Sequence, residues 1–260
     1  MIYTILLAVV IILFVILLSR KKYYVIPKKI WTFWDGEPPE IVKTCMDSWR
    51  KHCPGYQITL LNKESTPHIN QYKRAHDMIQ RYSDFVRIDV LSKEGGIWID
   101  ASTYLNGPFD WVHTGHEFVG FSMEPYEARD DWPGLENWFL AASPDSQFIK
   151  DWYEEFKKIN DYEKIEDYLA DVTNQGIDFT RLNGFYLVQH VAAQKCIQTK
   201  QYDISAMSAK QDAFRYLFDH EWDSKPAMEK ACRGEYADQK IIKMRGNERP
   251  HATPDCFKDT

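Results

Sequence analysis

The sequence lacks several features that would place it in a common class of protein. Its five cysteines form no C-x-x-C pair and are odd in number, so we expect neither a disulfide framework nor a zinc site. It has no N-x-S/T sequon, which favours a domain that never enters a secretory lumen. With 32 basic against 38 acidic residues, its net charge of -6 argues against general nucleic-acid binding, so we expect no nucleic-acid partner.

One hydrophobic run is long enough to concern a membrane. Residues 2–18 are apolar apart from Thr4, and at about 1.5 Å per residue this helix spans roughly 26 Å. No small-residue cleavage site precedes the basic cluster at residues 19–22, so we expect an uncleaved anchor over residues 1–20, with a cleaved signal peptide as the alternative. Because the basic cluster follows the run, the positive-inside rule predicts a cytoplasmic C-terminal domain.

After a short linker, residues 21–27, the chain is expected to form one domain over residues 28–260. Strands and helices alternate in its first half, which predicts an α/β fold with a mainly parallel sheet that binds ligands at the carboxyl ends of its strands. Hydrophobic periodicity predicts strands over 28–34, 56–62, 97–100 and 118–121, and helices over 40–52, 82–94, 145–159, 162–172 and 184–199.

The segment 83–102, S-D-F-V-R-I-D-V-L-S-K-E-G-G-I-W-I-D-A-S, is the most informative part of the chain. Gly95 and Gly96 predict a tight turn that folds a helix back onto an apolar strand, which ends in Asp100. Asp84 and Arg87 lie on a helix that is apolar on most of its circumference. Because an unpaired buried charge is costly, they are either a structural ion pair or bound to a ligand.

Asp100 and Ser102 lie two residues apart, where the predicted strand turns into a loop. Their oxygens suit Mg²⁺ or Mn²⁺, and such a cation neutralises the charge on a leaving diphosphate. A capping aspartate explains the same D-A-S sequence.

Three spans together resemble a known family: I-P-K-K-I-W-T-F-W-D-G at 26–36, the segment 83–102, and E-N-W-F-L-A-A at 136–142. In this order they resemble the capsular polysaccharide synthesis and glycosyltransferase family 32 group, which are sugar transferases with a DXD-type motif. The resemblance becomes weaker after Val191. It implies a GT-A-like, Rossmann-related fold with a mixed, mainly parallel sheet flanked by helices. It also implies a nucleotide-sugar donor, Mn²⁺ or Mg²⁺, and retention of anomeric configuration.

The resemblance also implies roles for individual residues at the donor. Trp34 would stack on the donor base, and Asp84 and Arg87 would bind the ribose or the donor sugar, with Gly96 beside the donor. Asp100 matches the metal-site aspartate and contacts the donor. At the second aspartate of the familiar motif this chain has Ser102, which leaves the strength of metal binding open.

The resemblance also implies a third metal ligand, a histidine from the C-terminal part of the chain. His251 is the first candidate, and His190 and His220 are alternatives, although each is also explained as an ordinary core or surface histidine. Lys243, Arg245 and Arg249 would meet the diphosphate or form a solvated face.

The resemblance further implies that Glu136 and Asn137 lie near the acceptor, where a carboxylate or an amide would stabilise an oxocarbenium-like transition state together with Asp100. The alternative is a helix or strand boundary. We therefore expect a membrane-anchored, metal-dependent glycosyltransferase that moves a hexose from a UDP- or GDP-sugar to a glycan or lipid-linked acceptor. A nucleotide-sugar hydrolase and a non-catalytic binding module are the alternatives.

Overall fold

The computed structural model describes residues 22–124, 132–253 and 255–257. The anchor predicted over residues 1–20 lies outside these residues. Within the described ranges, no helix combines the length and the apolar character needed to cross a bilayer.

A six-stranded sheet forms the centre of the fold, in the order β2-β1-β3-β6-β5-β7. The pairs β1/β2, β1/β3 and β5/β7 are parallel, whereas β6 runs antiparallel to both β3 and β5. The predicted α/β class with a mixed, mainly parallel sheet is therefore confirmed. The strands are β1 (Lys29–Phe33), β2 (Gln57–Leu61), β3 (Gly96–Ile99), β5 (Phe118–Ser122), β6 (Leu135–Ala142) and β7 (Ile204–Ser208).

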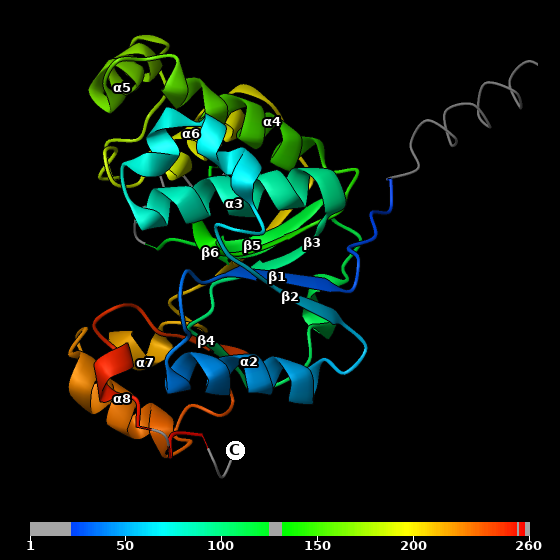
Figure 1. The fold of residues 1–260 in the computed structure, drawn as a ribbon, viewed down its shortest axis with the longest axis vertical. Coiled ribbons are helices and arrows are strands. Elements are labelled where there is room, and N and C mark those ends of the chain that lie inside the picture. The colour runs from blue at the N-terminus through cyan, green and yellow to red at the C-terminus, as the bar shows by residue number, and fades with distance from the viewer. Residues whose placement is uncertain (1–21, 125–131, 254, 258–260) are drawn as a thin grey trace, which may run out of the picture.

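Helices cover both faces of this sheet (Figure 1). The upper layer in the figure contains α3, α4, α5 and α6, and the lower layer contains α2, α7, α8 and the small antiparallel sheet β4/β8. Their bounds are α2 (Glu40–His52), α3 (Ile79–Glu94), α4 (Gln147–Lys157), α5 (Ile165–Asn174), α6 (Val188–Thr199), α7 (Arg215–Phe218), α8 (Ser224–Cys232), β4 (Thr103–Leu105) and β8 (Ile241–Lys243). Short 3-10 turns span Pro67–Gln71, Lys73–His76, Asp110–Val112, Lys158–Asn160 and Arg249–His251.

The strand β3 shows why its sequence is apolar throughout. Ile97 and Ile99 belong to the core between the sheet and the lower layer, and Trp98 belongs to the core between the sheet and the upper layer. Successive side chains of a strand point to opposite faces, so a strand covered on both sides needs an apolar residue at every position.

The predicted turn between α3 and β3 requires both glycines. Gly95 and Gly96 have φ angles of +61° and +101°, which L side chains rarely adopt. A Cβ on Gly95 would lie 2.6 Å from Pro144 Cδ, and one on Gly96 would lie 2.8 Å from the Lys29 carbonyl oxygen. The turn therefore fixes α3 close against β3 and sets the direction in which β3 runs.

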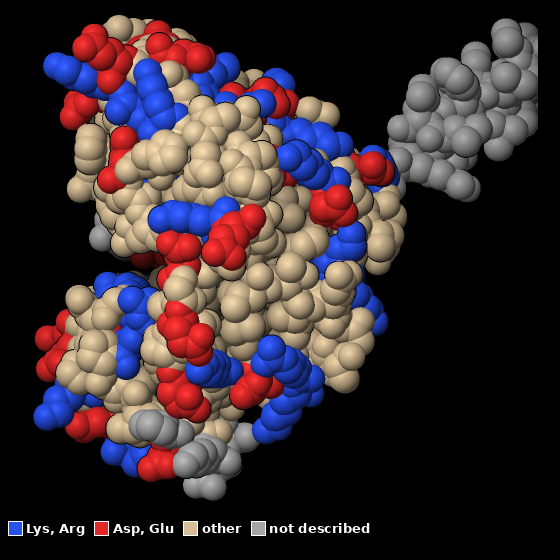
Figure 2. All heavy atoms as spheres, in the orientation of Figure 1, with Lys and Arg blue, Asp and Glu red and all other residues tan. Residues whose placement is uncertain are grey.

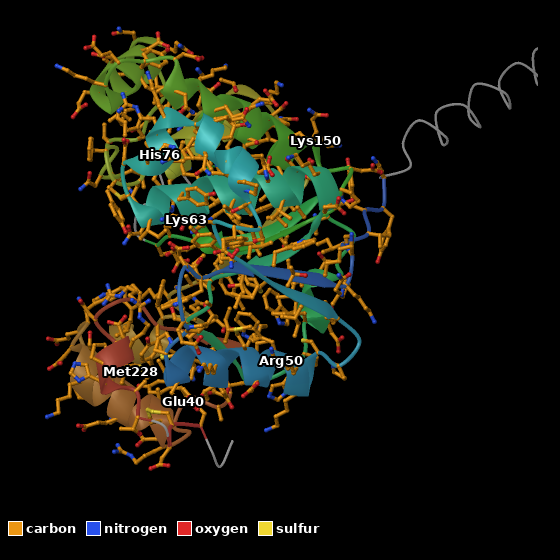
Figure 3. The ribbon with its side chains drawn as sticks, in the orientation of Figure 1. Glu40, Arg50, Lys63, His76, Lys150 and Met228 are labelled. Carbon is orange, nitrogen blue, oxygen red and sulfur yellow. A yellow bond between two sulfur atoms is a disulfide. The ribbon has the colours of Figure 1, made fainter. Side chains whose placement is uncertain are left out.

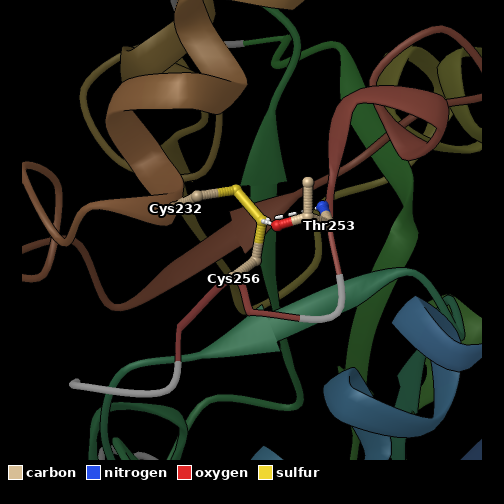
Figure 4. The surroundings of a disulfide bond; sticks show 3 residues. All are labelled: Cys232, Thr253 and Cys256. Atoms are coloured by element: carbon tan, nitrogen blue, oxygen red, sulfur yellow. Dashed lines mark hydrogen bonds between the residues drawn. A yellow bond between two sulfur atoms is a disulfide. The ribbon is translucent and has the colours of Figure 1, made fainter.

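One disulfide departs from the expectation drawn from the cysteine count. Cys232, at the end of α8, is bonded to Cys256 near the C-terminus, and Thr253 lies beside the bond (Figure 4). The other three cysteines are free and buried. The pair is 24 residues apart in no recognisable motif, so only the fold brings the two sulfurs together.

Candidate active site

Charged side chains from three elements meet beyond the carboxyl end of β3. Asp100 directly follows β3, Arg87 comes from α3, and Lys243 is the last residue of β8. Lys243 Nζ donates to Asp100 Oδ2 at 2.9 Å, Arg87 Nη2 lies 3.5 Å from Asp100 Oδ1, and Trp98 Nε1 donates to the same Oδ1 at 3.1 Å. The carboxylate of Asp100 thus lies between two cations, and we call Asp100, Arg87 and Lys243 the strand-end cluster.

The small sheet explains how Lys243 reaches this position. β4 begins at Thr103, and Thr103 pairs with Lys243 in the antiparallel register of β4 and β8. Ser102 continues the pairing: its amide carbonyl accepts from Met244 N at 2.9 Å, and its Oγ donates to the Met244 carbonyl at 2.7 Å. Lys243 is consequently buried, so the solvated face considered for it is wrong.

A second group of polar side chains continues the cluster into the upper layer. Asn137 Nδ2 donates to Asp84 Oδ1 at 3.1 Å and to Gln189 Oε1 at 2.8 Å. Arg87 Nη2 lies 3.5 Å from Asp84 Oδ1, and its Nη1 donates to the Asn137 carbonyl at 2.6 Å. The expected ion pair of Asp84 and Arg87 is therefore present, and Arg87 also joins it to Asp100.

The two aspartates have opposite electrostatic surroundings. Burial alone would raise the pKa of Asp100, but Lys243 and Arg87 outweigh burial and hold it below its usual value. At Asp84 burial prevails over Arg87 and Arg81, and the pKa is raised. Asp100 is therefore the carboxylate that stays ionised between fixed cations.

Glu136 lies on β6 within reach of the same charges. Burial raises the pKa of its carboxyl to about 7, the charge of Asp100 adds to this shift, and Lys243 and Arg245 oppose it. A carboxyl with this pKa exchanges its proton near neutral pH, as a group that takes part in proton transfer does. Asn137 contacts Asp84 and Glu136 precedes it on β6, and their expected role near the acceptor stays a prediction.

Two predicted donor residues lie apart from one another. Trp34 follows β1, and the Arg249 guanidinium lies 5.6 Å from its ring centre. Gly96 begins β3, at the end opposite to Asp100, and its conformation serves the turn after α3. Gly96 is therefore not brought to the strand-end cluster, and its contact with the donor stays a prediction.

The three candidate histidines are not brought to Asp100. His251 ends an exposed 3-10 turn, and no hydrogen bond or ion pair joins it to Asp100 or Ser102. His190 is buried on α6, where burial, and then Arg87, lower its pKa to about 3 and keep it neutral. His220 lies in the turn after α7. Among the described residues, therefore, no histidine is bonded to Asp100 or Ser102.

The residues present do not fit a resident divalent cation. Asp100 and Ser102 do lie together, but the Lys243 ammonium contacts both, at 2.9 Å from Asp100 Oδ2 and 3.5 Å from Ser102 Oγ. A dication there would displace a buried ammonium from its carboxylate partner or lie beside it, and both are costly. Across the described ranges no three His, Cys, Asp or Glu side chains are placed to bind a metal.

Sequence analysis missed two members of the site. Arg81 lies 3.7 Å from Asp84 through its Nε, and Gln189 Nε2 donates to the Asp84 backbone carbonyl at 2.8 Å. Arg81 precedes Asp84 by three residues on the same helical stripe, which was a usable signal. Gln189 comes from a distant helix, and nothing in its local sequence marks it.

The surface is open beside the site. Figure 2 shows a notch between the upper and lower layers at the left, the side toward which β1 runs. The strand-end cluster lies at the carboxyl ends of β1 and β3, which is where sheets of this kind bind their ligands.

Comparisons with known proteins give one family. A family model described as "Capsular polysaccharide synthesis protein" matches residues 17–245. A curated relative, the "O-glycosyltransferase braB" of Annulohypoxylon truncatum, is 27% identical over 165 residues. This match covers 52% of the present chain and 38% of the relative, so the chain spans well under half of that protein's length.

Several solved structures are similar at a lower level. The glycosyltransferase GlyE of Streptococcus pneumoniae TIGR4 is 12% identical with a TM-score of 0.45, over 90% of the present chain and 57% of GlyE. The galactosyltransferase LgtC, solved in complex with donor and acceptor sugar analogs, is 9% identical with a TM-score of 0.43, over 88% of this chain and 92% of LgtC.

Proposed function

Because this chain belongs to the capsular polysaccharide synthesis protein family, we propose that it is a glycosyltransferase that moves a hexose from a nucleotide-diphosphate sugar to a glycan or lipid-linked acceptor. The observation that carries the proposal is the pair of buried cations, Lys243 and Arg87, held on Asp100 at the carboxyl end of β3. A GT-A-like form of the α/β fold is part of the proposal. The relative braB is named as an O-glycosyltransferase, which agrees with it.

Lys243 and Arg87 are proposed to meet the donor diphosphate. When the bond between the sugar carbon and the phosphate oxygen breaks, negative charge grows on the leaving nucleotide diphosphate, and fixed cations in a site of low dielectric stabilise that charge. Asp100 holds both cations in place, and Asp84 is proposed to accept from hydroxyl groups of the ribose or the sugar. Trp34 offers its ring to the base. The predicted need for Mn²⁺ or Mg²⁺ remains a prediction, and no step above uses it.

We propose retention of anomeric configuration. In that reaction the acceptor oxygen forms a bond to the sugar carbon on the face that the phosphate leaves, and the acceptor proton passes to the departing phosphate oxygen. Glu136 then stabilises charge on the sugar. In the alternative, an inverting reaction, Glu136 takes the acceptor proton. Proton NMR of the first product separates the two, because it reports the anomeric configuration before the sugar equilibrates.

A nucleotide-sugar screen tests the proposed function. Purified protein is heated with each UDP- and GDP-sugar, with Mn²⁺ and with EDTA, and we expect one donor to raise the melting temperature, because a ligand that binds only the folded state stabilises it. The matched variant Lys243→Met should lose that shift. If no donor binds a folded protein, the proposal fails. Turnover of donor that no acceptor accelerates would instead establish the hydrolase.

We further propose that residues 1–20 attach the enzyme to a membrane, with the domain on the cytoplasmic side as the basic cluster predicts. The disulfide between Cys232 and Cys256 instead favours a domain on the non-cytoplasmic side of the membrane, because disulfides persist in oxidising compartments. Protease added to sealed vesicles with their cytoplasmic face outward should digest the domain. Full protection would place the domain in the lumen.

A further inference from the structure

The ammonium group of Lys243 lies against both oxygens that were expected to bind a divalent cation. Its Nζ is 2.9 Å from Asp100 Oδ2 and 3.5 Å from Ser102 Oγ. A Mg²⁺ ion lies about 2.0–2.1 Å from its oxygen ligands, so a cation bound to both oxygens would lie beside the ammonium group or in its place. The protein itself therefore supplies positive charge at the point where a metal would bring it.

The backbone of Lys243 is fixed, and its side chain is buried. Its N–H donates to the Ala213 carbonyl at 3.2 Å, its carbonyl accepts from Tyr216 Oη at 2.7 Å, and its side chain is 7% exposed. Lys63, which Figure 3 labels, also pairs with an aspartate, Asp35, at 3.0 Å, but its side chain is 49% exposed. Water can solvate the ammonium group of Lys63 when the pair opens, whereas separating the buried Lys243 from its partner is costly.

A second cation approaches the other oxygen of the same carboxylate. Arg87 Nη2 lies 3.5 Å from Asp100 Oδ1, and this side chain is 6% exposed. Its guanidinium is held by the Asn137 carbonyl, which accepts from Nη1 at 2.6 Å, and by the ring of Trp98, whose centre is 5.2 Å away. A dication at Asp100 would thus meet two fixed cations, and each would repel it twice as strongly as it repels a single charge at the same distance.

The ammonium group retains a donor for the substrate. An ammonium has three N–H donors, and among the described residues the acceptors of Lys243 are Asp100 and Ser102. The third N–H is therefore available to a phosphate oxygen. A lysine binds phosphate as a compact point charge, which is also what a metal ion contributes to a diphosphate.

We propose that donor binding and transfer need no divalent cation, because the Lys243 ammonium, together with Arg87, takes the place of one. This inference rests on the proposed function and concerns the cofactor of the same site. When the bond between the sugar carbon and the phosphate oxygen breaks, its electron pair stays on that oxygen, and the two side chains stabilise the charge while keeping their own protons. The new bond forms between the sugar carbon and the acceptor oxygen, whose proton passes to the leaving phosphate.

Removal of metal from the wild type is the first test. Protein treated with EDTA is assayed with the donor that the nucleotide-sugar screen identifies, once with EDTA present and once with Mn²⁺ or Mg²⁺ in excess. We expect the same rate of transfer in both. A loss of transfer in EDTA that either ion restores would overturn the inference and would leave the proposed function standing.

Mn²⁺ alone gives a second test that needs neither donor nor activity. The electron paramagnetic resonance signal of aqueous Mn²⁺ loses amplitude when the ion binds to protein, and the wild type should leave it unchanged. Lys243→His replaces the ammonium with an imidazole, which is a metal ligand when neutral, next to Asp100 and Ser102. This variant should bind Mn²⁺, and its transfer should then depend on the ion. Lys63→His is the matched control, because it places the same imidazole beside one exposed aspartate and should leave the signal unchanged.

The two tests separate the possible failures. Mn²⁺ bound by the wild type, or not bound by a folded Lys243→His, would overturn the inference. If Lys243→His does not fold, the wild-type signal and the assay in EDTA decide the question. If no nucleotide sugar binds under any condition, the proposed function fails, and Mn²⁺ binding still shows whether the ammonium group excludes a metal from this site.

Discussion

Two carboxylates on neighbouring elements differ in how their hydrogen bonds and cationic partners are arranged, and Asp100 is the more exposed of the two. Asp89, on α3, uses both oxygens: Oδ1 accepts from Tyr153 at 2.5 Å, and Oδ2 accepts from His68 and Lys93, each at 2.9 Å. Asp100, after β3, accepts one bond on each oxygen, from Trp98 and from Lys243. Both have a lowered pKa, so the direction of the shift alone does not separate them.

The cations around the two carboxylates do separate them. At Asp89 the cationic side chain of Lys93 is 55% exposed, so water solvates its charge. At Asp100 the side chains of Lys243 and Arg87 are 7% and 6% exposed, and the carboxylate uses few of their donors. The first arrangement leaves its positive charge in contact with water, whereas the second keeps its cations buried, where the proposed donor diphosphate would meet them.

Replacing Lys243 should produce the largest effect. We expect Lys243→Met to lower turnover about 10²–10³-fold, because one fixed donor that stabilises leaving-group charge contributes about that much. Single-turnover rates with saturating donor, measured on protein shown to be folded by circular dichroism, check this. Turnover equal to that of the wild type would mean that the strand-end cluster is structural, like the cluster of Asp89.

Replacing Asp89 should affect stability instead of chemistry. Asp89→Asn removes the charged acceptor of Tyr153, His68 and Lys93. Because the side chains of Lys93 and His68 are 55% and 45% exposed, the loss should come mainly from the buried hydrogen bond of Tyr153 and amount to about 1–3 kcal/mol. Denaturant unfolding measures the loss. Turnover per folded molecule should stay at the wild-type value, and a large fall in it would remove the contrast with Asp100.

Local sequence patterns predicted the elements that depend on local physics. Helix α2 spans Glu40–His52 as its apolar spacing predicted, and the turn at Gly95 and Gly96 was found from the two glycines. The small sheet β4/β8 was not found, because Thr103 pairs with a residue far away in the chain and each strand has only three residues. Long-range pairing of short strands leaves no periodic signal.

Site residues were likewise predicted where local sequence marks them, and missed where only long-range pairing places them. Asp84 and Arg87 were identified because charged residues on an apolar helix need a partner, and the structure pairs them. Lys243 was considered for the diphosphate or for a solvated face, since its own neighbourhood does not show that β8 buries it next to Asp100. Asp100 and Ser102 were inferred to bind a metal from their spacing at the end of the strand, without knowledge of the Lys243 ammonium that the fold places against both.

Glu136 should give a smaller effect that depends on pH. Its pKa is raised from 4.5 to about 7 in the folded state, so the folded protein binds more protons than the unfolded chain between these values. Its favourable contribution is complete below about pH 4.5 and is lost as the pH rises through about 7. The melting temperature of the wild type should therefore fall between pH 5 and pH 8. In Glu136→Gln this fall should be smaller by a few degrees, as thermal unfolding at several pH values measures. Parallel curves for both proteins would contradict this pKa.

Lys93→Met should have the smallest effect, and it tests the expectation that an exposed cation contributes little. Lys93 is half exposed, and Asp89 keeps Tyr153 and His68 after its loss, so the pair should contribute no more than about 1 kcal/mol to folding. Screening should reduce even this at high salt. Chemical denaturation at low and at high salt measures it, with Lys243→Met as the reference. If Lys93→Met and Lys243→Met lowered the free energy of unfolding equally, burial of the cation would not distinguish the two clusters. The same loss of charge would then cost the same in water and in the protein interior.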